Sequence, residues 1–214
     1  MKTILVCIVL CLAVSTTLFA QNDIVSPPKV LKDMFSNPQK RKPAIVKDKI
    51  SSEGVRWIWG DYRYSYVGTS TKEKSVRIMV LGLQKDTTEV VRLCFGIHAA
   101  DTKLKVEANS PVLIKFGDDT VYKTISLFSD EDNIGETHVL TYSTFSTYDI
   151  YVYIDLTDEL LSGLSKGFKK IRFEINNDIY DVEPRKDNIS KFIIDEHKLI
   201  KEAFNTKRSF DDDF

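Results

Sequence analysis

One literal match to a catalytic motif lies in the C-terminal part of the chain. Residues Gly163–Gly167 read G-x-S-x-G, the pattern that places a nucleophilic serine on a sharp strand-to-helix turn in α/β-hydrolases. His197 follows Ser165, with Asp181 or Asp187 between them as the acid. A helical pattern precedes the motif and a strand pattern follows it, which reverses the order that the turn needs. The sequence therefore favours a non-catalytic Ser165.

The acidic stretch Asp130–Glu136 (DEDNIGE) is the best candidate for a calcium loop. An EF-hand needs an oxygen ligand at its fifth position and a glutamate at its twelfth, and these positions hold Ile134 and Thr141. The histidines stand far apart, at His98, His138 and His197, without the close spacing of a zinc site. We therefore expect no metal and no cofactor. The stretch is interpreted as a solvated loop, with a looser surface calcium site as the alternative.

Aromatic residues are the most suggestive feature for binding. From Trp57 to Tyr66 they occupy alternating positions, interrupted at Gly60–Asp61, and Tyr151 and Tyr153 lie on the expected outward face of a strand. Exposed rings of this kind stack on sugars or contact a protein partner, whereas burial in the core is the alternative. The candidate ligand-binding residues are Trp57, Trp59, Tyr62, Tyr64, Tyr66, Tyr151 and Tyr153.

The elements that must position these rings are mostly strands. In Tyr148–Leu156 (YDIYVYIDL), Ile150, Val152, Ile154 and Leu156 fall on one face, which is the period of a half-buried strand. Long helical crossovers are missing, so an antiparallel sandwich or barrel-like sheet is expected. The other predicted strands are Val55–Val67, Ser75–Leu83, Glu89–Ile97, Val112–Phe116, Val121–Phe128, Thr137–Tyr142, Lys170–Ile175 and Ile179–Val182.

Two helices are predicted in the C-terminal part of the chain. The first, near residues 157–166, is capped by Thr157 and ended by Gly167. The second, at about Asn188–Asn205, carries an apolar stripe at helical spacing. The stripe is expected to pack on the sheet, and a docking helix for a partner is the alternative.

The ends of the chain differ in composition from its centre. Residues 1–20, with Lys2 before an apolar run, are predicted to be a signal peptide cleaved near Ala20, because that run is shorter than the roughly 20 residues of a membrane span. Residues 21–50 are predicted to be a Pro-rich basic linker, 51–205 a single β-rich domain, and 206–214 an acidic tail.

Charge and cysteine content narrow the class of protein. The formal net charge is −1, so no global basic field is available to bind nucleic acid. Cys94 is the one cysteine outside the predicted signal peptide and lies in the apolar run VVRLCFGI. The sequence therefore predicts a buried, inert thiol.

Two segments resemble a group of exported proteins. Gly167–Phe204 (GFKKIRFEINNDIYDVEPRKDNISKFIIDEHKLIKEAF) and Pro111–Val121 (PVLIKFGDDTV) are similar to segments of exported β-rich proteins of unassigned function from Gram-negative gut bacteria. In those proteins a G-(I/F)-x-K-I-R strand precedes a hairpin and a terminal helix. The resemblance implies export and a β-rich fold, and it transfers no catalytic residue.

Together these patterns predict a mainly β (α+β) protein, exported to the periplasm, the cell surface or the medium. We expect a non-enzymatic envelope protein that binds a glycan or protein partner through its aromatic residues, with no transmembrane segment in the mature chain. One alternative is a small secreted hydrolase that uses Ser165 and His197, or carboxylates that cannot be paired from the sequence. The other is a structural protein-interaction domain that uses the terminal helix.

Overall fold

A six-stranded antiparallel sheet organises the fold of the chain, for which we use a computed structural model. The structure describes residues 42–66, 75–132, 134–140, 143–184 and 186–209. The predicted signal peptide, most of the predicted linker and residues 210–214 of the predicted tail lie outside these ranges. The strands of this sheet, in spatial order, are β1 (Ile45–Ile50), β2 (Arg56–Tyr66), β3 (Ser75–Lys85), β4 (Thr88–Ala100), β10 (Ser143–Asp155) and β9 (Glu136–Leu140).

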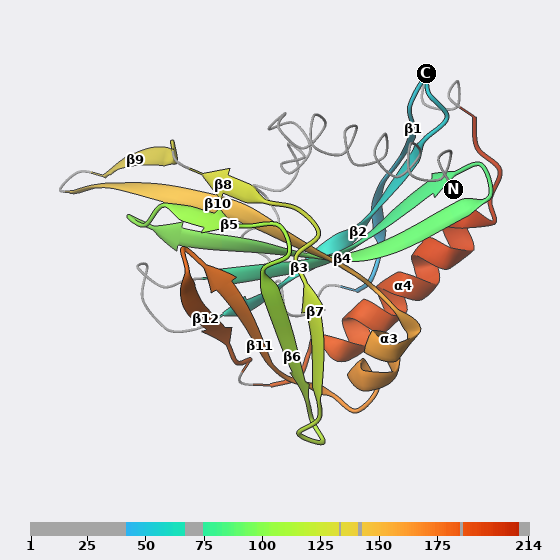
Figure 1. The fold of residues 1–214 in the computed structure, drawn as a ribbon. Coiled ribbons are helices and arrows are strands. Elements are labelled where there is room, and N and C mark those ends of the chain that lie inside the picture. Colours follow the sequence, from blue (N-terminus) through green and yellow to red (C-terminus); the bar gives the residue numbers. More distant parts are fainter. Residues whose placement is uncertain (1–41, 67–74, 133, 141–142, 185, 210–214) are drawn as a thin grey trace. The chain divides into compact units, whose positions relative to one another are not determined.

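A second, four-stranded sheet packs against one face of the first (Figure 1). Phe95 of the six-stranded sheet meets Phe173 of the second sheet edge to face, with 5.2 Å between the ring centroids. The strands of the second sheet, in spatial order, are β12 (Asp178–Val182), β11 (Phe168–Ile175), β6 (Pro111–Phe116) and β7 (Val121–Ile125). A short pair, β5 (Leu104–Val106) and β8 (Asp130–Asp132), forms a third, two-stranded sheet. The prediction of a mainly β, antiparallel, sandwich-like fold is confirmed.

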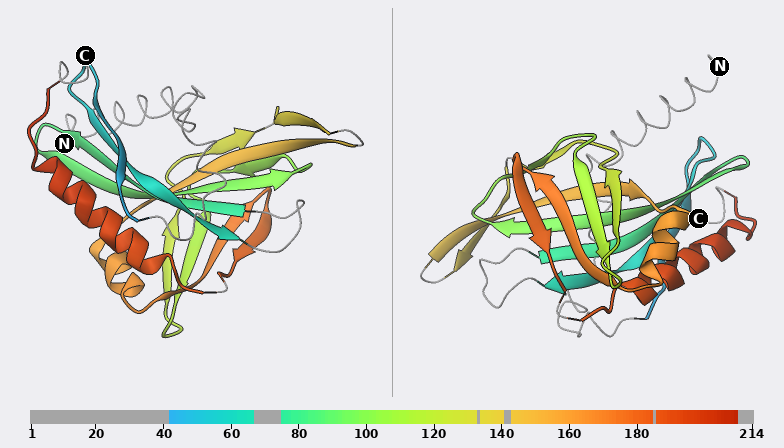
Figure 2. Two further views of the ribbon diagram at one scale, coloured as in Figure 1. Left: turned by 180° about the vertical axis from the view of Figure 1, so that it is seen from behind. Right: turned by 60° about the horizontal axis from the view of Figure 1, so that its bottom comes forward.

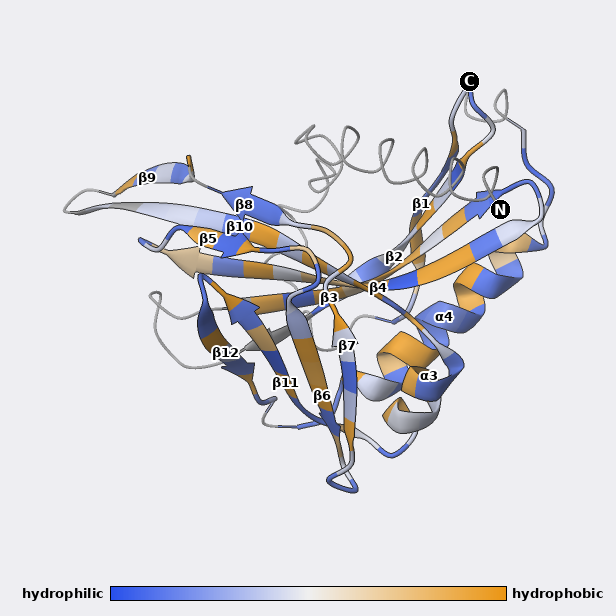
Figure 3. Ribbon diagram, viewed as in Figure 1, coloured by the Kyte–Doolittle hydropathy of each residue, from blue (hydrophilic) through white to orange (hydrophobic). Residues whose placement is uncertain are grey.

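Alternation of apolar and polar residues explains which face of each strand is buried. On β10, Ile150, Val152 and Ile154 are fully buried, as the period-two pattern predicts. On β11 the same alternation buries Ile171 and Phe173, and Figure 3 shows hydrophobic and hydrophilic residues following one another along this strand. The two sets of buried side chains form one continuous core between the sheets.

Helix α4 (Ser190–Phe204) covers the remaining part of the same face of the six-stranded sheet (Figure 2). Its apolar stripe packs mainly on β2 and β3. At Gly82 of β3 a Cβ atom would come within 2.5 Å of Ile200 and 2.8 Å of Phe204, so glycine lets the helix approach the sheet closely. Packing on the sheet was the expected use of this stripe, and the structure confirms it.

The structure places ordered elements in two segments that the sequence analysis treated as irregular. Strand β1 lies inside the predicted linker of residues 21–50, where it pairs with β2. In the predicted tail, the main-chain oxygen of Thr206 accepts a hydrogen bond from Arg56, and Arg208 donates to the main-chain oxygen of Asp48. The domain therefore begins before residue 51 and extends past residue 205.

The short helix α3 (Asp158–Leu164) supports a direct test of its predicted cap. The Thr157 hydroxyl accepts a hydrogen bond from the Leu160 amide, 3.2 Å away. Thr157→Ala is expected to lower the free energy of unfolding by about 1 kcal/mol because one amide at the helix start loses its partner. Urea denaturation should show this loss, and Thr157→Ser should retain most of the stability. An equal loss in both variants would contradict a capping role.

None of the described helices is both long enough and apolar enough to cross a membrane.

Candidate functional site

The register of the six-stranded sheet brings the predicted aromatic residues onto one face. Tyr62 lies opposite Met79, Met79 opposite Cys94, and Cys94 opposite Tyr153. Because directly opposed residues share a face of a sheet, Tyr62 and Tyr153 are on the same side although 91 positions separate them in the sequence. We call this side the aromatic face; its aromatic residues are Trp57, Trp59, Tyr62, Tyr151 and Tyr153.

A β-bulge at Gly60–Asp61 keeps the rings of β2 on that one face. Trp59 pairs with Leu81 and Tyr62 with Met79, so three steps along β2 match two steps along β3. In a regular strand, Trp59 and Tyr62, which are three positions apart, would point to opposite faces because side chains alternate; the bulge places both on the same face. Gly60–Asp61, which interrupts the aromatic alternation in the sequence, is thus the feature that places the rings of β2 on one face.

The rings differ in how far they reach solvent. Trp57 and Tyr153 are 9% and 6% exposed, and Tyr153 packs against Phe128 with 5.8 Å between the ring centroids. Trp59, Tyr62 and Tyr151 are half-buried. Burial of Trp57 and Tyr153 therefore limits the binding role that the sequence predicts for these rings as exposed residues.

The two tryptophans form a stacked pair next to strand β1. Their ring centroids are 5.9 Å apart, and the Lys47 ammonium group lies 4.7 Å from the Trp59 centroid. In β2, Tyr64 pairs with Arg77 and Tyr66 with Ser75, and the side chains of these two tyrosines are outside the described part.

A charged network flanks Tyr151 on the aromatic face. Arg77 donates a 2.6 Å hydrogen bond to Asp149, and His98 Nδ1 lies 3.3 Å from the same carboxylate. Burial alone would raise the pKa of Asp149, but the hydrogen bonds and charges of His98 and Arg77 outweigh it and hold the pKa below its ordinary value. At neutral pH the network therefore contains a carboxylate that Arg77 neutralises.

Gly96 gives this network its compact geometry. A Cβ atom at position 96 would lie 3.0 Å from the Tyr151 ring and 3.4 Å from Arg77 Nε. The Arg77 guanidinium carbon lies 6.0 Å from the Tyr151 centroid, within the range of a cation–π contact. The Arg77 and Tyr151 side chains therefore lie directly over the main chain of Gly96.

Cys94 lies on the aromatic face but is not available for chemistry. Its side chain is 1% exposed, and burial raises the pKa of the thiol to about 12. The prediction of a buried thiol is confirmed, and at that pKa the thiolate is absent at neutral pH.

The residues of the hydrolase alternative do not form a triad in the described part of the chain. Ser165 ends α3, and its hydroxyl donates a 2.6 Å hydrogen bond to the Ser162 carbonyl. Asp181 of β12 pairs with Arg172 of β11, and Asp187 accepts hydrogen bonds from main-chain amides. His197 is half-buried on α4, where burial and nearby Lys201 lower its pKa. In the described part of the chain, Ser165 forms no hydrogen bond with His197 or with either acid.

The acidic stretch uses its carboxylates to bind main-chain amides. Asp130 accepts a hydrogen bond from the Tyr151 amide and Asp132 one from the Asp149 amide, at 2.7 and 3.0 Å. These bonds fasten β8 along an edge of β10, beside the aromatic face. In the residue ranges given above, no three His, Cys, Asp or Glu side chains are grouped to hold a metal ion.

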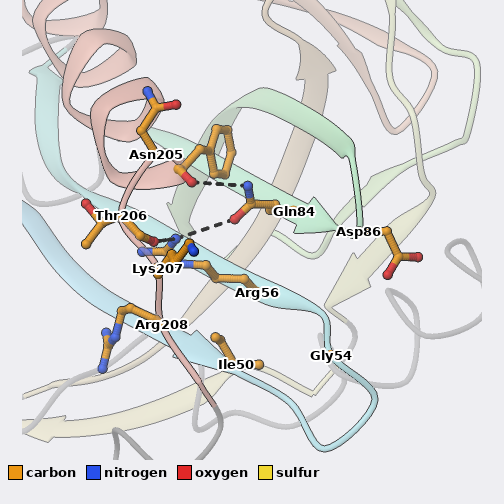
Figure 4. A pocket seen from close by; sticks show the side chains of 10 residues that line it. Ile50, Gly54, Arg56, Gln84, Asp86, Asn205, Thr206, Lys207 and Arg208 are labelled. Carbon is orange, nitrogen blue, oxygen red and sulfur yellow. Dashed lines mark hydrogen bonds between the residues drawn. The ribbon is translucent and has the colours of Figure 1, made fainter.

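A pocket of about 360 Å³ lies near the C-terminal end of α4 (Figure 4). Arg56 and Gln84 line it together with the residues that follow the helix. Arg56 Nε and Nη2 bind Asp48 at 2.8 and 2.7 Å, and Nη1 binds the Thr206 carbonyl at 2.8 Å. The Arg56 side chain is therefore committed to holding the chain after α4 on the sheet.

Arg77 and His98 are site residues that the sequence analysis did not single out. Arg77 occupies an alternate, outward position in the predicted strand Ser75–Leu83, and His98 directly follows the predicted strand Glu89–Ile97; both are ordinary places for a polar residue. What assembles them is the pairing of β3, β4 and β10, which come from distant parts of the sequence. Only the register of those strands identifies the network.

No family model, no curated protein and no solved structure matches the chain. A functional assignment therefore depends on the geometry of its own residues.

Proposed function

We propose that the protein is a non-enzymatic binding module that holds a glycan polymer on the aromatic face. The observation that supports this most is the alignment, through strand register and a bulge, of Trp59, Tyr62 and Tyr151 on one side of the sheet. The opposite side is occupied by α4 and the second sheet. Among the described elements, α4 and the second sheet thus pack on the face opposite to the one that we propose for recognition.

The chemistry of the face suits a sugar. Aromatic rings offer flat apolar surfaces with polar rims, which match the C–H faces and the hydroxyl groups of a sugar ring. His98 and Asp149 are 33% and 36% exposed, beside the half-buried Tyr151. Their nitrogen and oxygen atoms can exchange hydrogen bonds with hydroxyl groups that a purely apolar partner lacks.

The spacing of the rings favours a polymer over a single sugar. Tyr62 lies on β2 and Tyr151 on β10, with β3 and β4 between them. Three inter-strand steps of about 4.8 Å separate those strands by about 14 Å. A ligand that contacts both rings must therefore extend across the strands.

Export belongs to the same proposal. The apolar segment at residues 1–20 and its basic start support secretion, and extracellular or envelope glycans are then the accessible ligands. The single cysteine of the remaining chain, buried at position 94, is compatible with that environment.

Affinity electrophoresis in gels that contain soluble polysaccharides tests the proposal. The chain should be retarded by one class of polysaccharide, and Trp59→Ala and Tyr151→Ala should each weaken binding about tenfold or more, as aromatic hot spots do. Tyr151→Phe should bind nearly as well as the parent, because it keeps the ring.

Ile179→Ala is the matched control. Ile179 is 67% exposed and lies on β12 of the second sheet, so its loss should leave retardation unchanged. If Ile179→Ala weakens binding as much as Trp59→Ala, or if both aromatic variants bind like the parent, the ligand is not held on the aromatic face.

A further inference from the structure

A glutamate is enclosed between α4 and the six-stranded sheet. Glu196 is 1% exposed and lies on the buried stripe of α4, between Ile193 and Ile200. Its Oε1 accepts a 2.8 Å hydrogen bond from the Ala44 amide, whereas Oε2 has no hydrogen-bond partner in the described part of the chain. A carboxylate in this setting would carry a charge that is withdrawn from solvent.

The sheet provides a space for this carboxyl group at the bulge of β2. A Cβ atom at Gly60 would overlap Glu196 Oε2, so any residue other than glycine would displace the acid. The bulge that aligns Trp59 and Tyr62 therefore also forms the floor of the Glu196 site.

The carboxyl group holds the segment that leads into β1. The Ala44 amide donates to Glu196, and the Ala44 carbonyl accepts a 2.8 Å hydrogen bond from the Asp61 amide. Both polar groups of this residue are thereby bound to α4 and to the bulge. Strand β1 starts at the next residue and carries Lys47, whose ammonium group lies over Trp59.

The charged groups facing Glu196 are Asp61 and Arg63 of β2. The segment before β1 contributes the Ala44 peptide group, and on β3 the main-chain oxygen of Val80 would lie 3.1 Å from a Cβ atom at Gly60. Burial raises the pKa of Glu196 to about 8; the Ala44 and Asp61 amides and the Arg63 charge oppose the rise, and the Asp61 charge adds to it. The acid is therefore neutral at pH 7 and ionises within a mildly alkaline range.

We propose that Glu196 is a proton-controlled latch that holds Ala44 and the start of β1 against α4 when neutral and releases them when ionised. Ionisation places an enclosed charge beside the negative Asp61, and the charge regains solvation when the segment before β1 moves away. Because β1 is an edge strand whose neighbour in the described sheet is β2, its first residues, up to Lys47, can move away while Asp48 stays bound to Arg56. Release also moves Lys47 away from Trp59. This latch does not depend on the identity of any ligand.

Fluorescence of Trp59 in the full-length Trp57→Phe variant reports this release. The chain has two tryptophans, so Trp59 is then the sole indole, and withdrawal of Lys47 should change its emission. Between pH 6 and 9.5 we expect a sigmoidal change with a midpoint near pH 8. Adding Glu196→Gln, which resembles the neutral acid, should abolish the change.

Two further variants separate the latch from general alkaline effects. Asp61→Asn should shift the midpoint to lower pH because it removes the negative charge beside Glu196. Glu202→Gln removes an exposed acid from the same helix and should leave the midpoint unchanged. The Ala44 amide resonance of the parent chain gives a second readout and should titrate at the same midpoint. A transition that persists in Glu196→Gln, or a parent chain with no transition in this range, would overturn the latch.

Discussion

The Glu196→Gln variant is expected to become more stable than the parent as the pH rises. The folded-state pKa of Glu196 is about 8, against an ordinary value of 4.5. Because folding raises the pKa of Glu196, the contribution of the neutral acid to the stability of the folded protein is complete below pH 4.5. This contribution is lost as the pH rises towards 8. At about 1.4 kcal/mol per pKa unit, the difference between variant and parent should change by about 4 to 5 kcal/mol over this interval.

Guanidinium denaturation at pH 5, 6, 7 and 8 provides the measurement. Glutamine keeps the acceptor for the Ala44 amide and places an NH₂ group where the neutral acid has its second oxygen, so the geometry is preserved. Glu202→Gln on the exposed side of α4 controls for the general loss of an acid. A difference between Glu196→Gln and the parent that is constant with pH would show that Glu196 has an ordinary pKa in the folded protein.

Loss of the buried Arg56 side chain is the second large effect that we expect. Arg56 and Asp48 are 5% and 15% exposed and form a two-point contact, with Nε and Nη2 at 2.8 and 2.7 Å from the carboxylate oxygens. Arg56→Met should lower the free energy of unfolding by about 3–5 kcal/mol, because the Asp48 charge stays buried without its main partner. It should also release the chain after α4, since Arg56 holds the Thr206 carbonyl.

The pair Arg172–Asp181 is a matched control with the same geometry and a different environment. Its two contacts are 2.6 and 2.8 Å, but the side chains are 41% and 30% exposed. Arg172→Met should change stability much less than Arg56→Met, because the Asp181 carboxylate that remains is partly hydrated and keeps its contact with Lys170. Urea unfolding of the two variants in parallel tests this, and equal losses would show that burial does not govern the strength of these pairs.

Period-two alternation was sufficient to predict most strands of the sheets. It identified β2, β3, β4, β10 and β11, because in each of them one face packs into the core and the opposite face is less buried. Thr157 and Gly167 were also informative, since a capping hydroxyl and a residue with a φ of 97° are local features.

Elements whose cause is not local were missed. β1 follows Pro43 and has exposed apolar residues, Ile45 and Val46, so neither composition nor alternation indicates a buried face. β5 and β8 contain three residues each, which is too short for a period. β8 is held in place because Asp130 and Asp132 accept hydrogen bonds from amides of β10. No sequence pattern predicts these contacts.

Part of the candidate site was visible in the sequence and part was not. The aromatic alternation indicated one face of a strand, but whether β2 and β10 present their rings on the same side depends on the register of β3 and β4 between them. Burial of Tyr153 depends on Phe128, a contact between segments that no local pattern relates. Glu196 did carry a signal, since it interrupts the apolar stripe between Ile193 and Ile200.

Titration of tryptophan fluorescence with a panel of soluble glycans tests the central claim, binding at the aromatic face, most directly. Both tryptophans of the chain belong to that face, so a bound glycan should change their emission. We predict a saturable change with one class of glycan, absent in Tyr151→Ala at the same concentrations and retained in Ile179→Ala. A flat response to every glycan at concentrations where affinity electrophoresis shows binding would contradict the account, because the ligand would then lie elsewhere.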